Sequence, residues 1–231
     1  KRVRLSEFKN IRTNGLRAIQ LREDDELIRV VVTSGNDGII LGTYHGNAVS
    51  FHEDKVRAMG RTASGVRGVS LREGDYVIGM DILTPDREVL VVSEKGYGKR
   101  TAASEYALKG RGVKGVRTLR ITEKNGPLVC LRTVTGDEDL LIMTNKGVII
   151  RFHAEDVSQT GRGALGVRMM RLDQDAIVSS LAIVDREDET EEASEATESA
   201  ATETPTASLS DEAIKGNMKD FAQQLVDEEN E

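Results

Sequence analysis

The chain has 231 residues, enough for one or two domains with a buried core, and its formal net charge at pH 7 is −7. It contains no apolar run near the roughly 18 residues of a transmembrane helix and no basic-then-apolar signal segment, so we expect no membrane association. The single cysteine, Cys130, cannot form a disulfide within the chain, which fits a reducing, cytoplasmic setting. Because the chain opens on Lys1 rather than on methionine, we expect it to be a segment of a longer protein.

The charge is distributed unevenly along the chain. Residues 185–231 hold 16 acidic and 3 basic residues, a net charge of −13, whereas residues 1–184 hold 23 acidic and 29 basic residues, a net charge of +6. A mildly basic body with a strongly acidic tail predicts a polyanionic partner or regulation of the body by the tail.

Three kinds of glycine landmark recur with one period of 50 or 51 residues, and this regularity indicates an internal repeat. One landmark opens a Gly-Val-Arg signature, one belongs to a Gly-Arg pair five residues earlier, and one lies at a predicted turn. Most of them are expected to be turn glycines. The landmarks are Gly65, Gly115 and Gly166, then Gly60, Gly110 and Gly161, then Gly46, Gly96 and Gly147, with a weaker copy at Gly15.

Each repeat is predicted to contain four short strands, which makes the body all-β. The segments are rich in β-branched residues and bounded by Gly, Asn or Asp, a pattern typical of strands rather than helices. Four strands per repeat of this length indicate a propeller-like blade, and about three and a half blades are recognisable. In chain order the predicted first strands are 38–44, 88–94 and 139–145, the second 47–51, 98–102 and 148–152, the third 66–71, 116–121 and 167–172, and the fourth 76–83, 127–134 and 176–184.

The arginines of the Gly-Val-Arg signature are predicted to be structural. In a regular strand Arg67, Arg117 and Arg168 would each share a face with apolar residues two and four positions later. We therefore expect them on the core side near the end of the strand, either with the charged group reaching out to solvent or paired with a carboxylate between blades.

A second set of cations flanks the predicted turns and has few neighbouring carboxylates in the sequence. Because these residues recur at matching places in successive repeats, we expect them to line up along one rim as a track for a phosphate backbone. The candidate DNA-binding residues are Arg57, Arg61, Lys99, Arg100, Lys109, Arg111, Lys114, Arg151 and Arg162.

The sequence offers no catalytic, metal or cofactor site. The three histidines His45, His52 and His153 match no metal-ligand spacing, and no phosphate-binding Gly-x-x-x-x-Gly-Lys loop or nucleophile–base pair is recognisable. Motifs that read a base sequence are also absent, so sequence-tolerant binding of duplex DNA is the favoured function. Two other classes remain open: a propeller that binds an acidic protein, and an enzyme with a site in a central channel.

The segments "VRAMGRTASGVRGVSL", "EKGYGKRTAASEYALKGRGVKGV" and "GRGALGVRMMRL" closely resemble the C-terminal domain of the bacterial DNA gyrase A subunit. The resemblance covers residues 1–184. It implies a β-pinwheel with strands exchanged between blades, whose rim wraps duplex DNA and supports negative supercoiling. It also implies a parent enzyme that uses ATP and Mg²⁺ and combines two A subunits with two B subunits.

The chain departs from this family in two respects. The first-blade box Gln-Arg-Arg-Gly-Gly-Lys-Gly is absent, and about three and a half blades replace the family's six. None of the four tyrosines matches the motif of the parent's catalytic tyrosine, so no catalytic residue is carried over to this segment. The A subunit of topoisomerase IV is the nearest alternative, although its repeats tend to be less regular than these.

The tail at 185–231 is predicted to be disordered because it is rich in Glu, Thr, Ser and Ala and almost lacks large apolar residues. A short helix is predicted near 211–226, capped by Ser210. The apolar residues on one face of it would be Ile214, Met218, Phe221 and Leu225. The tail is either a solubilising segment or a competitor of DNA for the basic rim.

Overall fold

The computed structural model describes residues 1–11 and 13–186 of the chain, which contain eleven β-strands and four short 3-10 helices. The predicted acidic tail and its helix lie outside the described residues, apart from Asp185 and Arg186. No helix among the described residues is long and apolar enough to cross a membrane.

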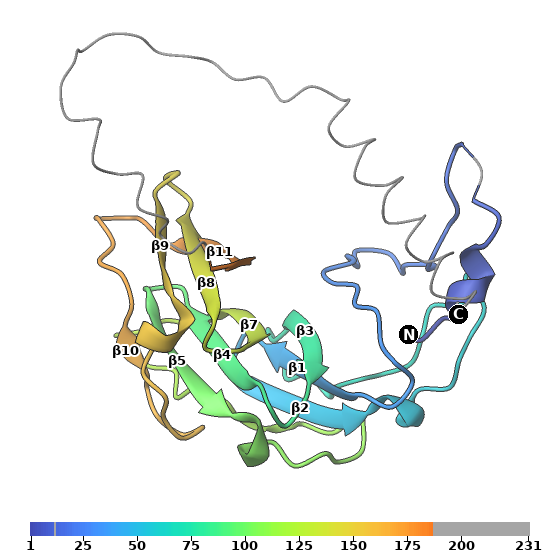
Figure 1. Cartoon of the computed structure of the whole chain (residues 1–231), viewed down its shortest axis with the longest axis horizontal. Coiled ribbons are helices and arrows are strands. Elements are labelled where there is room, and N and C mark those ends of the chain that lie inside the picture. The colour runs from blue at the N-terminus through green and yellow to red at the C-terminus, as the bar shows by residue number, and fades with distance from the viewer. Residues whose placement is uncertain (12, 187–231) are drawn as a thin grey trace, which may run out of the picture. The chain divides into compact units, whose positions relative to one another are not determined.

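The first sheet is built on an antiparallel hairpin of two strands, each of which is paired again on its other side. The strand order is β3-β1-β2-β6, so β6 forms one edge of the sheet. Figure 1 labels the other three strands of this sheet. The strands are β1 (Gly38–Thr43), β2 (Asn47–His52), β3 (Val77–Leu83) and β6 (Val116–Arg117).

The second sheet repeats this plan, and the third keeps the hairpin and one flanking strand. The second has the order β10-β5-β4-β7, and the third has the order β11-β8-β9 (Figure 1). The strands of the second are β4 (Glu88–Ser93), β5 (Tyr97–Ala102), β7 (Leu128–Val134) and β10 (Val167–Arg168). Those of the third are β8 (Glu138–Thr144), β9 (Ile149–His153) and β11 (Val178–Asp185).

The outer strand of each of the first two sheets comes from the following repeat. β6 lies by sequence in the repeat that contains β4, β5 and β7, but it pairs with β2, where Asn47 lies opposite Arg117. β10 lies by sequence in the repeat that contains β8, β9 and β11, but it pairs with β5, where Gly98 lies opposite Val167. The predicted all-β fold of four-stranded blades with exchanged strands is therefore confirmed.

The first glycine of the Gly-Val-Arg signature makes this exchange possible. Gly115 has a φ of +79°, and a Cβ atom there would lie 2.3 Å from the carbonyl oxygen of Ala48 in β2. Gly166 has a φ of +84°, and a Cβ atom there would lie 2.8 Å from the carbonyl oxygen of Gly98 in β5. Only glycine combines this backbone conformation with so close an approach, so these glycines do more than form turns.

Four 3-10 helices mark the four copies of the repeat, and the last three each follow the second strand of a hairpin. In the first copy Arg2 bridges to Ala58, and the first 3-10 helix follows. Among the described residues before Gly38, this bridge is the only strand-like pairing. The helices are η1 (Leu5–Phe8), η2 (Glu53–Lys55), η3 (Ala103–Glu105) and η4 (Ala154–Asp156).

The core lies between successive sheets, with β4 at its centre. Val89 and Val91 contribute to the cluster shared by the first and second sheets, whereas Leu90 and Val92 contribute to the cluster shared by the second and third. All four side chains are completely buried, and burying each contributes about 1.5–3 kcal/mol. The continuous apolar run of this segment therefore reflects a strand covered on both faces.

The third predicted strand of each repeat is much shorter than expected. Only two residues are paired in β6 and in β10, and no strand is assigned at 66–71. After Arg117 the chain leaves strand geometry, and Thr118 and Leu119 are both buried. Side chains alternate between the two faces only within a regular strand. These strands end too early for that alternation to place the signature arginines on the core side.

Candidate nucleic-acid interface

Three segments that include the Gly-Arg pair and the Gly-Val-Arg signature carry many cations and no acidic residue. They are residues 59–72, 109–120 and 160–171, and we call them the edge segments because the second and third supply the edge strands β6 and β10. Nine of their eleven cations are exposed, and Arg61 and Arg162 are half-buried. The cations are Arg61, Arg67 and Arg72, then Lys109, Arg111, Lys114, Arg117 and Arg120, then Arg162, Arg168 and Arg171.

The edge segments are hydrogen-bonded to one another in series. The amide of Ser70 in the first segment donates to the carbonyl of Val113 in the second at 2.9 Å. The amide of Arg120 in the second segment donates to the carbonyl of Ala164 in the third at 3.2 Å. Cations that are fifty residues apart in sequence are thus carried on one connected backbone path.

The arginines of the Gly-Val-Arg signature lie on the surface, so the prediction that they face the core is wrong. Arg67, Arg117 and Arg168 are all exposed. Arg168 stacks over the ring of Tyr97 with 5.6 Å between its guanidinium carbon and the ring centroid, and its Nη2 donates to the tyrosine hydroxyl at 3.1 Å. Their exposure adds one cation per repeat to the predicted track.

The nine predicted DNA-binding residues differ in their accessibility. Five are exposed, three are half-buried and one is completely buried. The exposed residues are Arg57, Lys109, Arg111, Lys114 and Arg151, the half-buried ones are Arg61, Arg100 and Arg162, and the buried one is Lys99.

Lys99 lies inside β5 rather than beside a turn, so its expected place on the rim is wrong. Its side chain is completely buried, and its Nζ donates to the carbonyl oxygens of Gly161 at 2.5 Å and Arg162 at 2.7 Å. Burial lowers the pKa of Lys99 to about 8. This ammonium group binds the protein's own backbone and cannot reach a phosphate.

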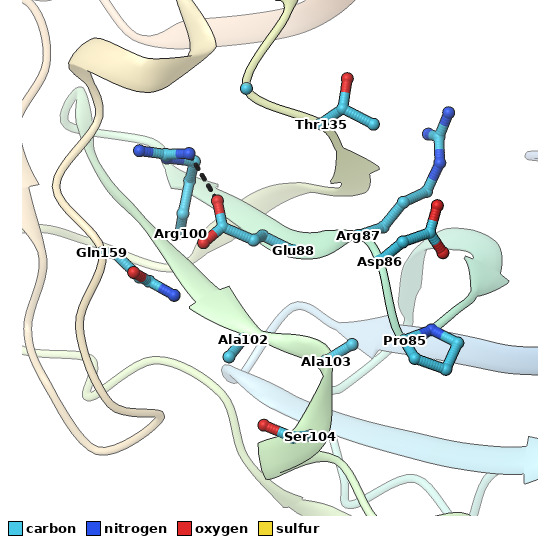
Figure 2. A pocket seen from close by; sticks show the side chains of 11 residues that line it. Pro85, Asp86, Arg87, Glu88, Arg100, Ala102, Ala103, Ser104, Thr135 and Gln159 are labelled. Atoms are coloured by element: carbon cyan, nitrogen blue, oxygen red, sulfur yellow. Dashed lines mark hydrogen bonds and ion pairs between the residues drawn. The ribbon is translucent and has the colours of Figure 1, made fainter.

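Arg100 is also occupied within the protein, contrary to the expectation that few carboxylates would lie near the candidate cations. Its Nη1 pairs with Glu88 at 2.5 Å, as Figure 2 shows, and its Nε and Nη2 donate to the carbonyls of Val157 and Glu155. The pair lines a cleft of about 420 Å³ that also holds Asp86 and Arg87 (Figure 2). The formal charges of these four residues sum to zero, so the cleft has no excess of positive charge.

Two further candidates are paired with carboxylates. The Nε of Arg151 lies 2.7 Å from Asp139, which also accepts a hydrogen bond from His153 at 2.6 Å. These two hydrogen bonds lower the pKa of Asp139 although desolvation opposes them, with His153 as the larger contribution. The Nε of Arg162 lies 3.6 Å from Glu105. Their charges are partly neutralised, which reduces what they offer a polyanion.

Arg61 and Arg111 differ from these residues because their guanidinium groups donate to backbone carbonyls. The Nη1 of Arg61 donates to Arg17, and Arg111 donates to Lys55 and Arg67. A carbonyl fixes the position of the guanidinium group without cancelling its charge. These two guanidinium groups are thus held in place with their positive charge retained, which suits a phosphate backbone.

Sequence reasoning missed Arg67, Arg72, Arg117, Arg120, Arg168 and Arg171 as candidates. The signal that identifies them is compositional: each edge segment lacks any Asp or Glu in a chain that holds 39 of them. Among the described residues, no group of three His, Cys, Asp or Glu side chains is placed to hold a metal ion.

Comparison with known proteins supports a single family. The family described as "DNA gyrase C-terminal domain, beta-propeller" matches residues 1–34, 39–84, 87–129 and 138–185. The DNA gyrase A subunit of Staphylococcus epidermidis is 53% identical over 191 residues, which are 82% of this chain and 21% of that protein. The corresponding protein of Staphylococcus aureus is 53% identical over 201 residues, which are 85% of this chain and 23% of that protein. The chain therefore spans about a fifth of the length of these relatives.

Two solved structures share the fold. A crystal structure of the C-terminal domain of DNA topoisomerase IV has a TM-score of 0.74 and 27% identity, covering 78% of this chain and 57% of that one. A structure of the DNA gyrase A C-terminal domain has a TM-score of 0.68 and 27% identity, covering 74% of this chain and 58% of that one. Taken with the repeat, the exchanged strands and the family match over most of residues 1–185, these likenesses show that the chain belongs to the DNA gyrase C-terminal domain family.

Proposed function

We propose that the three edge segments bind the phosphate backbone of duplex DNA and bend it along the domain. The observation that carries this proposal is the connected path of eleven cations without an acidic residue. The names of the relatives, which are DNA gyrase A subunits, support it.

The energetics of such binding are favourable at modest salt. Roughly eight phosphate contacts would give a slope of about −7 for the logarithm of the binding constant against the logarithm of the salt concentration. Smooth bending of a 20–30 bp site by 40–90° costs on the order of 1–6 kcal/mol. Contacts to the DNA phosphate backbone do not distinguish one base sequence from another. Any preference for particular DNA sequences would therefore reflect how easily those sequences bend.

The parent enzyme that we propose is a gyrase-type topoisomerase, acting in the cytoplasm. In it this domain would wrap DNA for ATP-dependent negative supercoiling, while two A and two B subunits, with ATP and Mg²⁺, would supply the chemistry. The chain itself offers the binding surface and no proposed catalytic residue.

A protein of the topoisomerase IV type is the second candidate because one structure of its C-terminal domain has a TM-score of 0.74. The 53% identity to gyrase A relatives favours gyrase. The two candidates can be distinguished by sealing nicked circular DNA with ligase in the presence of the chain and measuring the linking number of the product. A chiral wrap of the gyrase kind shifts the linking number, whereas binding without a wrap leaves it unchanged.

The experiment that tests the track measures DNA affinity by fluorescence anisotropy over a range of salt concentrations. Replacing Arg67, Arg117 and Arg168 by Gln removes three exposed cations from the edge segments. We expect the salt slope to become shallower by about 3 because each phosphate contact contributes about 0.9.

The matched control replaces Arg22, Lys95 and Lys146 by Gln, three exposed cations outside the edge segments. It should leave the slope within about one unit of the wild-type value. Equal slopes for both triple variants would refute the track. Salt-sensitive binding to an acidic protein without binding to duplex DNA would instead favour a protein-interaction propeller.

A further inference from the structure

Lys99 occupies an unusual place for a lysine. It lies in β5, completely buried, where Val91 of β4 is its pairing partner. Its Nζ reaches outward to two consecutive carbonyls, those of Gly161 and Arg162, at 2.5 and 2.7 Å. A buried ammonium group is costly unless it is paired, and here backbone oxygens of the next repeat provide the pairing.

These two carbonyls belong to the beginning of the third edge segment. On the same face of β5, Thr101 donates from its hydroxyl to the carbonyl of Thr160 at 2.9 Å. Two residues beyond Arg162, Ala164 accepts the hydrogen bond from Arg120 that joins the second and third edge segments. Lys99 thus anchors the backbone at the point where the cationic path passes from one repeat to the next.

The same contact occurs at the equivalent position of the first repeat. Three residues occupy equivalent positions because the backbone carbonyl of each accepts a hydrogen bond from the amide of the residue just before a Gly-Arg pair. These residues are Arg2, Ser50 and Arg100, and the amides belong to Met59, Lys109 and Thr160, respectively. The residues preceding them are Lys1, Val49 and Lys99. The Nζ of Lys1 donates to the carbonyl of Arg61, which matches the contact of Lys99 with Arg162.

Where the lysine is missing, another cation holds the loop. At the position of Val49 no ammonium group is present, and the second Gly-Arg loop is tied down by the side chain of Arg111 itself, through the carbonyls of Lys55 and Arg67. Holding the Gly-Arg loop with a cation is therefore a recurrent feature of the repeat.

The groups that face Lys99 decide how firmly it keeps its proton. Desolvation is the main influence on its pKa, which lies at about 8; Glu105 of η3 opposes the lowering, and Arg162 of the loop adds to it. Tyr106, which follows η3, lies beneath Arg162, with 6.0 Å from its ring centroid to the guanidinium carbon. A charged donor makes a hydrogen bond about twice as strong as a neutral one, so proton loss would weaken the hold on both carbonyls.

We propose that Lys99 is a positioning residue for the DNA track: its buried ammonium group fixes the Arg162 loop, and loss of its proton loosens the loop and weakens DNA binding. This inference rests on the proposed function. It also assigns to Lys99 a role that needs no contact with DNA.

The test measures the affinity of the whole chain for a Cy5-labelled duplex of about 30 bp, at constant ionic strength, from about pH 6.5 to about pH 9.5. We expect wild-type affinity to fall about fivefold as the pH rises through 8. Lys99→Arg keeps a permanent charge and should show no such fall, whereas Lys99→Met should bind weakly at every pH, also without a fall. The arginine variant retains the amino terminus of Lys1, so a fall caused by that group would persist in it.

A second measurement follows the loop without DNA. In the wild type, the NMR signals of the Gly161, Arg162 and Gly163 amides should titrate with a midpoint near pH 8. In Lys99→Arg these signals should stay constant with pH. If Lys99→Arg does not fold, Lys99→Met takes its place in this measurement. A wild-type pH dependence of DNA affinity that persists in both variants would overturn the proposal, as would loop signals that do not titrate. If the wild type binds no duplex at any pH, the proposed function fails, and the proposal for Lys99 fails with it.

Discussion

At the scale of single residues, the role of each cation is decided by the groups that surround it. Lys99, Arg100 and Arg151 are engaged by carbonyls or carboxylates of the protein, whereas Arg67 and Arg117 project into solvent. In the sequence these residues are equal positive charges. The structure separates the cations that are engaged within the fold from those that are available to a polyanion.

Asp139, the carboxylate partner of Arg151, provides a test of whether such internal pairing stabilises the fold. Because its pKa is lowered below 3.8, the carboxylate stabilises the fold at pH values above 3.8, and this stabilisation is lost as the pH falls through the lowered pKa. We predict that the wild type resists urea better than Asp139→Asn at pH 5 and that the difference shrinks in more acidic solution. A difference that stayed constant to the lowest pH at which the protein folds would show that ion pairing of Asp139 is not the cause.

At the scale of elements, the close approach of the edge segments to the neighbouring hairpins depends on glycine. Gly115 lies at a positive φ directly against the backbone of Ala48. Gly110, five residues earlier, has no positive φ, and a methyl group added there would meet no atom within 4 Å. The same added methyl group should therefore have opposite consequences at the two sites.

We predict that Gly115→Ala lowers the free energy of unfolding by about 2–4 kcal/mol because the methyl group meets a backbone carbonyl and the residue must keep a left-handed conformation. Gly110→Ala should change it by less than about 0.5 kcal/mol. Urea unfolding of both variants measures the difference. Equal stabilities would mean that β6 does not pair with β2 as described.

The elements that the sequence predicts best are the hairpins, and the exchanged strands are the ones it predicts least well. The hairpin β4–β5 follows from an apolar run, a turn glycine and the repeat, all of which are local signals. The burial of Lys99 depends on carbonyls 62 and 63 residues away, and the exposure of Arg117 depends on a strand that ends after two residues. No local pattern carries that information, although the absence of acidic residues from the edge segments does indicate where the cations gather.

At the scale of the whole described body, the repeat places one local motif three times along a connected series of segments. Each edge segment contributes at least three cations, and backbone hydrogen bonds join it to the next. Under the proposed function, we therefore expect a duplex that contacts one edge segment to reach the following one. Because binding depends on charge along the path, its strength should fall steeply with salt.

The most direct test of this account is photo-crosslinking to DNA from single cysteines placed along the path. Burial raises the pKa of Cys130 to about 12, so that thiol stays unlabelled while Arg67→Cys, Arg117→Cys and Arg168→Cys each accept a photoreactive group. Lys146→Cys, at the β8–β9 turn, is the matched control. We expect comparable crosslinking to duplex DNA from all three edge positions and little from this turn. An equal yield from the turn, or crosslinking from only one edge position, would contradict the proposed path.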